Sequence, residues 1–426
     1  MRSRMTGMRK RFLLAAVVLL FPTTVRAASV TVDCSGVTPG AFTTISAALG
    51  TLDNIGPHTI TVTGTCVENV FLGQRDRLTI QAPGGQTATV SAANRNGPVF
   101  NVAGSHNIFL RRLVISGGSD GIGVGGGSLV TIEGTVIENN TGRGLALDLN
   151  SVALLGGNSS TQFVSIRNNG AAGLNANGSF ALIIGGVTIE NNTGAGIGIT
   201  GGRLIVNGNV QENFIRGNSL GVNVSGAVAT FLGQNSIQNN GDTGVQVVNG
   251  GSAAFNALHL SDGSFRVNVI EGHAQIGLHV AAAASGNLTG PNIIRSNGGA
   301  GFTSNDIHGG VNVGTVSRIQ FSGGNQISNN LGPGIAARFN GAIVLGDSVV
   351  TNNTEQGLLL IRQSVGLVET GASISGNGAA NAFCDSTSLL AGELTGVTNI
   401  DCSKVERTLG PPRPGAIKNL PNPLTP

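Results

Sequence analysis

The chain has 426 residues, of which 68 are glycine and only 11% are charged, and it contains neither Trp nor Tyr. The first 27 residues hold six of the 24 basic residues and no acidic ones, so the remainder carries 18 basic against 21 acidic groups, a net charge of −3. This balance gives no electrostatic basis for binding nucleic acid or anionic membranes. Alternating valine and isoleucine through the Gly-rich sequence favours packed β structure over disorder.

Residues 1–27 are typical of a secretory signal peptide. Five basic residues precede the apolar run 12–21, and the small-residue sequence Val25-Arg26-Ala27 follows it. The run is about half the length of a membrane-spanning helix, and no other apolar stretch is long enough. We therefore expect cleavage after Ala27 and a secreted or periplasmic protein without a membrane span.

The sequence AFTTISAALGTL at 41–52 predicts a short amphipathic helix. It would place Phe42, Ile45, Leu49 and Leu52 on one face. Such a helix can cover the open end of a β solenoid, where an unpaired strand edge needs a cap. Strands are expected to follow at 59–64, 77–82, 88–92 and 109–115.

From residue 115 onward one sequence motif recurs, as in TIENNTGAGIGIT at 188–200. The apolar residues that open it are Ile115, Ile137, Ile166, Ile189, Ile215, Ile237, Ile270, Ile294, Ile327, Val350 and Ile374. Steps of 22 to 33 residues mark a solenoid, and apolar residues at every second position mark strands. A leucine-rich repeat would show a helical half, which this pattern lacks. We therefore predict an all-β, right-handed parallel β-helix over 28–402, with the short helix as its N-terminal cap.

The third residue after each opening residue, from Ile137 onward, forms a predicted asparagine ladder. Its members are Asn140, Asn169, Asn192, Asn218, Asn240, Asn297, Asn330, Asn353 and Asn377, with His273 in the tenth position. Coils stack about 4.8 Å apart, so each amide can donate to one coil and accept from the next. We expect these asparagines to adopt left-handed backbone at a corner. The glycines that follow, such as Gly196, are expected to supply positive φ where a strand restarts.

A column of alternating charge stands directly after the opening residues. It comprises Glu138, Arg167, Glu190, Arg216, Gln238, Glu271 and Arg295. Exposed neighbours of opposite sign stabilise by roughly 0.2–1 kcal/mol per pair. We interpret this column as a solvated ion-pair series and not as catalytic acids and bases.

Four cysteines allow three disulfide pairings. Cys34 and Cys66 lie near the first coils, and Cys384 and Cys402 near the last. About eleven coils at 4.8 Å separate the two groups, which is far beyond the reach of a disulfide. We therefore predict Cys34–Cys66 and Cys384–Cys402, in keeping with an oxidising, exported setting.

After Cys402 the composition changes. Six of the 13 prolines lie in 403–426, so we expect a flexible or extended tail there.

The N-terminal phrase FTTISAALGTL, the following HTITVTGTCVEN and the NNxGxG coils resemble the pectin-lyase-like superfamily of right-handed β-helix proteins. The resemblance covers about 29–402 and is closest to exported bacterial proteins known for a β-helix repeat. It implies the fold and leaves the activity open, because the superfamily includes lyases, hydrolases, esterases, epimerases and adhesins.

The catalytic motifs of the superfamily are not reproduced. Polygalacturonase-like members carry Asn-Thr-Asp, Asp-Asp, Gly-His-Gly and Arg-Ile-Lys on successive coils. Here the nearest matches at 304–306, 308–310 and 318–320 fall within one coil, and Asp-Asp is absent from the sequence. The clustered acids and basic residue of pectate-lyase-like members, and the Asp and Gln pairs of pectin-methylesterase-like members, are also missing. One Gly-Gly-Ser-Asp-Gly at 117–121 is too little for a calcium repeat, so we expect no metal and no cofactor.

If a site exists, insertions should locate it, because loops on rigid scaffolds carry function. The two 33-residue steps suggest that segments near 251–268 and 303–320 wall a shallow groove. The candidate catalytic residues there are His279, Asp306 and His308, and the candidate ligand-binding residues are His273, His279 and Arg318. The alternative is a substituted turn residue and ordinary surface histidines.

An outward-facing column of small, uncharged residues offers a flat contact face. It is predicted to comprise Ala146, Asn175, Gly198, Asn223, Gln246, His279, Thr303 and Ala336. The preferred hypothesis is an exported scaffold or surface protein that contacts polysaccharide or a cell-surface glycan and has no recognisable catalytic site. The alternatives are a polysaccharide lyase or glycoside hydrolase acting near 251–320, and an adhesin.

Overall fold

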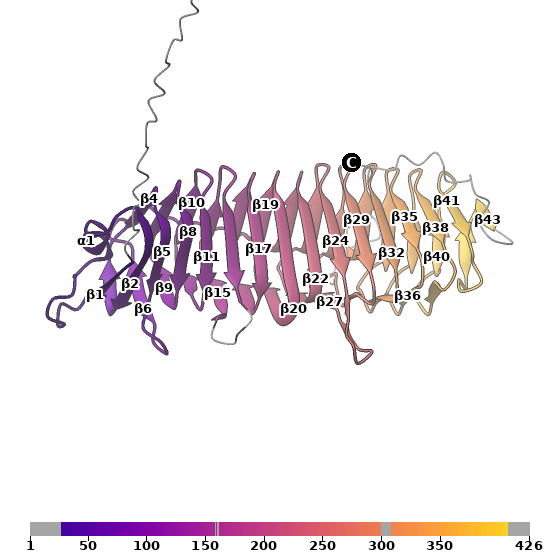
Figure 1. Ribbon diagram of the computed structural model, residues 1–426. Helices are drawn as coiled ribbons and strands as arrows, with labels where there is room; N and C mark the ends of the chain where they lie inside the picture. Colours follow the sequence, from indigo (N-terminus) through magenta and orange to yellow (C-terminus); the bar gives the residue numbers. More distant parts are fainter. Residues whose placement is uncertain (1–26, 158, 160–161, 300–307, 408–426) are drawn as a thin grey trace, which may run out of the picture.

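The computed structural model describes residues 27–157, 159, 162–299 and 308–407. The predicted signal peptide up to residue 26, the tail beyond Arg407 and the candidate Asp306 lie outside these residues. The chain is a right-handed parallel β-helix, drawn in Figure 1 as a long shaft along which the colour runs from indigo to yellow. The predicted fold class is confirmed.

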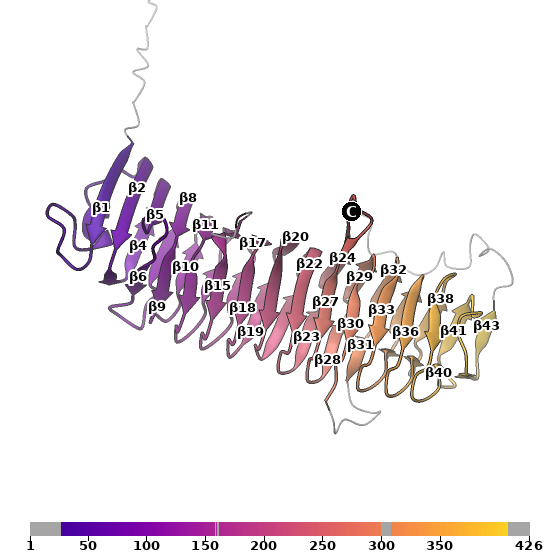
Figure 2. The same ribbon diagram turned by 90° about the horizontal axis from the view of Figure 1, so that it is seen from below.

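Each coil contributes strands to three faces. A 27-stranded sheet forms faces 1 and 2, and a 14-stranded sheet forms face 3. Figure 2 shows the same stack of coils from below.

Face 1 contains β1 (Ala28–Asp33), β2 (Ile55–Thr63), β5 (Asp76–Gln81), β8 (His106–Arg111), β11 (Leu129–Glu133), β14 (Val152–Gly156), β17 (Phe180–Gly185), β24 (Ser252–Asn256), β29 (Ser285–Thr289), β32 (Arg318–Ser322), β35 (Ala342–Leu345), β38 (Val365–Val368), β41 (Leu389–Gly392) and β43 (Val405–Arg407). Face 2 contains β3 (Thr65–Val67), β6 (Ala88–Ser91), β9 (Leu113–Ser116), β12 (Val136–Glu138), β15 (Val164–Arg167), β18 (Val187–Glu190), β27 (Asn268–Glu271), β30 (Ile293–Arg295), β33 (Asn325–Ser328), β36 (Ser348–Thr351) and β39 (Ser373–Ser375). Two long strands run through both faces, β20 (Arg203–Arg216) and β22 (Val228–Gln238).

Face 3 contains β4 (Val70–Gly73), β7 (Phe100–Ala103), β10 (Ile122–Gly125), β13 (Leu145–Leu147), β16 (Leu174–Asn177), β19 (Ala195–Thr200), β21 (Leu220–Ser225), β23 (Thr243–Val248), β28 (Ile276–Val280), β31 (Gly309–Gly314), β34 (Ile335–Arg338), β37 (Leu358–Leu360), β40 (Ala382–Cys384) and β42 (Ile400–Cys402). A separate antiparallel hairpin consists of β25 (Leu258–His259) and β26 (Phe265–Arg266). We name the corners by the faces they join: corner 1–2, corner 2–3 and corner 3–1.

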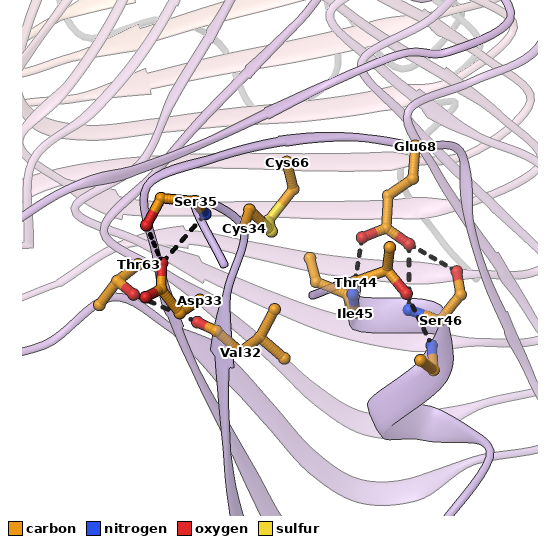
Figure 3. The surroundings of a disulfide bond; sticks show 11 residues. Val32, Asp33, Cys34, Ser35, Thr44, Ile45, Ser46, Thr63, Cys66 and Glu68 are labelled. Atoms are coloured by element: carbon orange, nitrogen blue, oxygen red, sulfur yellow. Dashed lines mark hydrogen bonds between the residues drawn. A yellow bond between two sulfur atoms is a disulfide. The ribbon is translucent and has the colours of Figure 1, made fainter. Parts of the chain in front are cut away.

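The N-terminal cap is shorter than predicted. Helix α1 spans Ile45–Leu49 and buries Ile45 and Leu49, whereas Phe42 forms an isolated parallel bridge with Val32. The carboxylate of Glu68 accepts hydrogen bonds from the backbone N–H groups of Ile45 and Ser46 at 2.6 and 3.0 Å (Figure 3). A negative group at the first turn suits the unpaired N–H groups and the dipole of the helix.

The other end of α1 is held by a cation. Arg75 donates from its guanidinium to the carbonyls of Leu49, Leu52 and Asp53 at 2.8 to 3.0 Å. Positive charge at a helix C-terminus is favourable for the same reason. The cap is therefore fixed at both ends by residues of the second coil.

Both predicted disulfides form, Cys34–Cys66 and Cys384–Cys402 (Figure 3 shows the first). Each joins neighbouring coils, with Cα atoms 5.1 and 4.4 Å apart. Strand β43 pairs with β41 after Cys402, so the coil continues to Arg407, beyond the predicted boundary at 402.

The asparagine ladder is confirmed at corner 2–3. Side-chain links of 2.8 to 3.1 Å join the Nδ2 of one asparagine to the Oδ1 of the next, four in a row from Asn140 to Asn240 and three from Asn297 to Asn377. Each Oδ1 also accepts a backbone N–H from the coil before, as from Asn192 N to Asn218 Oδ1 at 3.0 Å. The ladder thus satisfies buried main-chain donors where no sheet hydrogen bond is available.

Two details of the predicted corner are wrong. The left-handed φ belongs to the residue before each ladder asparagine, for example Asn191 at 56° before Asn192. The glycine after it does not take positive φ. A Cβ on Gly196 would lie 2.7 Å from Asn218 Nδ2 and 2.7 Å from Ile215 Cγ2, so glycine is required there by the close approach of the next coil.

Two further ladders were not predicted. At corner 1–2, amide links of 2.8 to 3.0 Å join Asn213, Asn235, Asn268, Asn292 and Asn325. At corner 3–1, a serine hydroxyl accepts the backbone N–H of the serine in the coil before it, as from Ser105 N to Ser128 Oγ at 3.0 Å. All three corners are therefore built on side chains that replace missing main-chain partners.

The alternating charge column lies on face 2 as expected. Ion pairs join Arg167 to Glu138 at 2.8 Å, Arg216 to Glu190 at 2.9 Å, and Arg295 to Glu271 at 2.6 Å. The arginine side chains are 42 to 48% exposed, so solvent screens the pairs and each contributes little.

His273 takes an asparagine position in the ladder without breaking it. Its Nδ1 accepts the backbone N–H of Asn240 at 3.2 Å, and its Nε2 lies 3.0 Å from the carbonyl oxygen of Ile237. The neutral ring with the proton on Nε2 therefore supplies one acceptor and one donor in the places where an asparagine amide has them. Burial lowers the pKa of His273 to about 4, because a charged ring would lose its solvation and its acceptor atom.

Replacing Asn218 with alanine should lower the free energy of unfolding by about 1–3 kcal/mol, because the buried N–H of Asn192 loses its acceptor. Urea unfolding followed by circular dichroism measures the change. Asn223→Ala, which removes an outward asparagine of the same coil, should change stability by less than about 0.5 kcal/mol. Equal losses in both variants would contradict the structural role of the ladder.

Acidification should destabilise the protein through His273. Because its folded pKa lies below the ordinary 6.5, its contribution is complete above about pH 6.5. It is lost as the pH falls towards 4, by about 3 kcal/mol in total. His273→Asn should flatten the pH dependence of urea unfolding in this range, whereas the exposed His259→Asn should leave it unchanged. A slope that His273→Asn does not alter would refute this account.

Candidate functional site

The predicted site residues lie in different parts of the coil. His273 is buried in the asparagine ladder at corner 2–3, where both ring nitrogens already have partners. His279 projects from β28 on face 3, His308 precedes β31, and Arg318 begins β32 on face 1. The structure therefore does not gather them into one constellation among the described residues.

The two insertions also leave the coil at different corners. The first forms the β25–β26 hairpin between β24 and β27, at corner 1–2. The second lies between β30 and β31, at corner 2–3. The described residues of the two segments therefore lie at different corners of the coil.

The predicted column on face 3 is confirmed from Ala146 to His279 and again at Ala336, and differs only at the position given to Thr303. His279 pairs with Asn312 in the next coil, and Gly310 takes the glycine position opposite Gly277. The sequence predicts Thr303 in this column because Gly301 stands at the spacing of a corner glycine, but Thr303 lies outside the described residues. We name Asn223, Gln246, His279 and Asn312 the polar strip, since they occupy one register position on four adjacent strands of face 3.

The polar strip holds unused hydrogen-bonding capacity. Asn223 Oδ1, His279 Nδ1 and Asn312 Nδ2 are buried atoms outside standard hydrogen-bond geometry, and the neighbouring side chains of His279 and Asn312 still interact with each other. Asn312 is only 1% exposed, whereas the other three side chains are partly exposed. Buried polar atoms normally have partners, so these atoms suit a ligand or water that supplies donors and acceptors.

His279 is neutral at pH 7. Burial lowers its pKa, and the opposing effects of Asp242 and of Asn312 are smaller. A neutral imidazole offers one donor and one acceptor. The strip is therefore an uncharged row of amides and one imidazole, at intervals of about 4.8 Å along the shaft.

His308 belongs to a separate pair. Its Nε2 lies 3.3 Å from Glu355 Oε1, and the histidine is 2% exposed. His308 stands beside Gln275, because Gly309 pairs with Ile276. It is thus four residues along the strand from His279, or about 13 Å, so the two histidines cannot act on one atom.

Two shallow hollows lie elsewhere on the described surface. One, of about 450 Å³, lies over the asparagine ladder and is lined by Asn191, Asn192, Thr193, Gly217, Asn218, Ser219, Asn239 and Gly241. The other, of about 510 Å³, lies near corner 1–2 and is lined by Gly84, Gly85, Arg111, Arg112, Glu133, Ser159 and Gln162. Neither hollow includes a residue that the sequence proposed for catalysis or binding.

Metal-ligand geometry is limited to one group in the described part of the chain, Cys34, Cys66 and Glu68. Both of its sulfur atoms are in a disulfide, and its carboxylate caps α1. This group is therefore a structural one. None of the helices described is long and apolar enough to cross a membrane.

Comparison with known proteins adds a family for part of the chain. Residues 150–308 match the family described as right handed beta helix region. No curated protein matches the chain. The mannuronan C-5 epimerase AlgE6 A-module of Azotobacter vinelandii is 14% identical with a TM-score of 0.40, covering 86% of this chain and 93% of its own.

Two other solved structures are similar at comparable distance. The AlgE4 A-module of the same organism is 12% identical with a TM-score of 0.35, over 86% of this chain and 91% of its own. The GH136 lacto-N-biosidase of Eubacterium ramulus is 10% identical with a TM-score of 0.24, over 89% of this chain and 68% of its own. Residues 150–308 thus match the right handed beta helix family, and the described residues on either side of them continue the same three-faced parallel β-helix.

Proposed function

We propose that the protein is an exported β-helix scaffold whose polar strip binds polysaccharide without turnover. The observation that carries this proposal is the row of polar side chains on four adjacent strands, in which the buried Oδ1 of Asn223 has no hydrogen-bond partner and His279 and Asn312 reach only each other. Sugar hydroxyls both donate and accept, so they can satisfy carboxamide oxygens, amide N–H groups and a neutral imidazole together. The two disulfides are consistent with an oxidising, exported compartment.

The geometry favours an extended ligand. One strip residue follows another at each coil, so the same kind of contact repeats along the shaft at about 4.8 Å. No strip residue carries charge at pH 7, and rigid strands hold the row in place. Because the side chains are fixed by the coil, little ordering is needed when a ligand binds.

The His308–Glu355 pair favours a second candidate, a polysaccharide lyase or glycoside hydrolase. A histidine beside a carboxylate is an arrangement that general acid–base catalysis can use. The near-complete burial of His308 and its distance from His279 make binding without chemistry the better-supported function.

The test is affinity electrophoresis of the purified protein against a panel of soluble polysaccharides, with product analysis by chromatography. His279→Ala and Gln246→Ala should each weaken the retained interaction by about five- to tenfold, because each removes a hydrogen-bonding group from the strip. Thr200→Ala, on face 3 outside the strip, is the matched control. No product should appear.

Turnover that disappears in His308→Gln would support the enzyme and refute the scaffold. Wild-type binding that both strip variants retain would refute the strip as the binding site.

A further inference from the structure

Corner 1–2 carries three exposed apolar side chains. Phe163, Val210 and Phe265 are 52, 49 and 47% exposed. They come from three irregular segments: the loop between β14 and β15, the bulge between Gly208 and Asn213 in β20, and the β25–β26 hairpin. Figure 1 shows this hairpin projecting from the lower edge of the shaft. We name Phe163, Val210, Gln211 and Phe265 the corner track.

The first half of the track depends on a glycine. A Cβ on Gly186 would lie 2.4 Å from Phe163 Cδ1 and 2.6 Å from Gln211 Oε1. Only a residue without a side chain lets the aromatic ring and the amide meet over this coil. Gly186 also has φ of 66°, which an L side chain rarely adopts. The ring and the amide are therefore placed together by the coil between them.

The second half is tied to the same bulge. Arg266 donates from Nη1 to the carbonyl oxygen of Asn209. The ring of Phe265 packs edge-on against His259, with centroids 4.7 Å apart and planes at 62°. The hairpin is thus anchored at its base, and its exposed aromatic ring is held by a neighbour.

The charged groups of this corner already have partners. Glu212 accepts from Gln234 Nε2 at 2.9 Å and from the hydroxyl of Ser236, and Arg266 is bonded to a carbonyl. By contrast, the side-chain oxygens of Asn209 and Gln211 are buried without a hydrogen-bond partner. The track therefore combines apolar platforms with neutral acceptors, and it offers an anion no unpaired cation among the described residues that form it.

The ligand class follows from this combination. A pyranose ring has an apolar face that stacks on an aromatic ring and hydroxyls that donate to amide oxygens. Phe163 and Phe265 are four coils apart, or about 19 Å, with Val210 midway. We propose that the corner track binds an uncharged polysaccharide chain lying parallel to the shaft axis. The site is separate from the polar strip on face 3, and it shares only the general ligand class with the proposed function.

The experiment is affinity electrophoresis in gels that contain hydroxyethyl cellulose, dextran, laminarin or galactomannan, with alginate and polygalacturonate as acidic arms. At least one uncharged polymer should retard the wild type. Phe163→Ala and Phe265→Ala should each weaken that binding about three- to tenfold, and the double variant should lose it. Phe339→Ala removes a ring that is 48% exposed at corner 3–1 and is the matched control. Circular dichroism checks that each variant is folded.

Three results would overturn the corner track. The first is no retardation by any uncharged polymer, and the second is binding confined to the acidic polymers and abolished by salt. The third is a double variant that binds as the wild type does. If His279→Ala and Gln246→Ala then lose binding, the polar strip stands and the track fails. If only the phenylalanine variants lose it, the track stands and the strip fails.

Discussion

The structure depends on how a parallel coil satisfies its main chain at the corners. Sheet hydrogen bonds end where a strand turns, and buried N–H groups there need another acceptor. Each corner supplies one from a side chain, as Asn218 does for Asn192 N at corner 2–3, Asn213 for Val187 N at corner 1–2 and Ser128 for Ser105 N at corner 3–1. Because each acceptor sits one coil away, the ladders tie together the register of the coils that carry them. The apolar core and the placement of the outward columns follow from that register.

The fold could be predicted because its signal is local and repeated. The asparagine stands three residues after the opening apolar residue whatever the length of the step, so one rule predicts both Asn140 and Asn377. The ladder through Asn213 also has a sequence signal, an asparagine two residues before the opening apolar residue. This signal is weaker because it occurs in fewer coils. The reason for the corner glycines, such as Gly196, could not be predicted. The sequence shows that a side chain is absent, but not whether positive φ or a close neighbour requires its absence. The sequence predicted Thr303 beside His279 because Gly301 stands at the spacing of a corner glycine, whereas Asn312 is the residue that pairs with His279.

The candidate sites could be predicted less well, because they depend on which corner an insertion leaves. The sequence identified the 33-residue steps but not that one insertion lies at corner 1–2 and the other at corner 2–3. His273, which looked like a binding residue because it interrupts the ladder, is a tautomer-specific substitute for asparagine. His279 was placed correctly as an outward residue. The atoms left without partners, which carry both binding proposals, arise from packing between coils and have no signature in a single segment.

Cysteine cross-linking tests the register most directly. Thr200 and Ser225 are partners on adjacent strands of face 3, and Val248 lies one coil further. Neighbouring coils are about 4.8 Å apart, within the Cα separation of a disulfide, whereas two coils span about 10 Å and exceed it. Thr200→Cys with Ser225→Cys should therefore form a disulfide, detectable by mass spectrometry of a digest under mild oxidation. Thr200→Cys with Val248→Cys should not. A bond in the second pair but not the first would contradict the stacked corners from which both binding surfaces are derived.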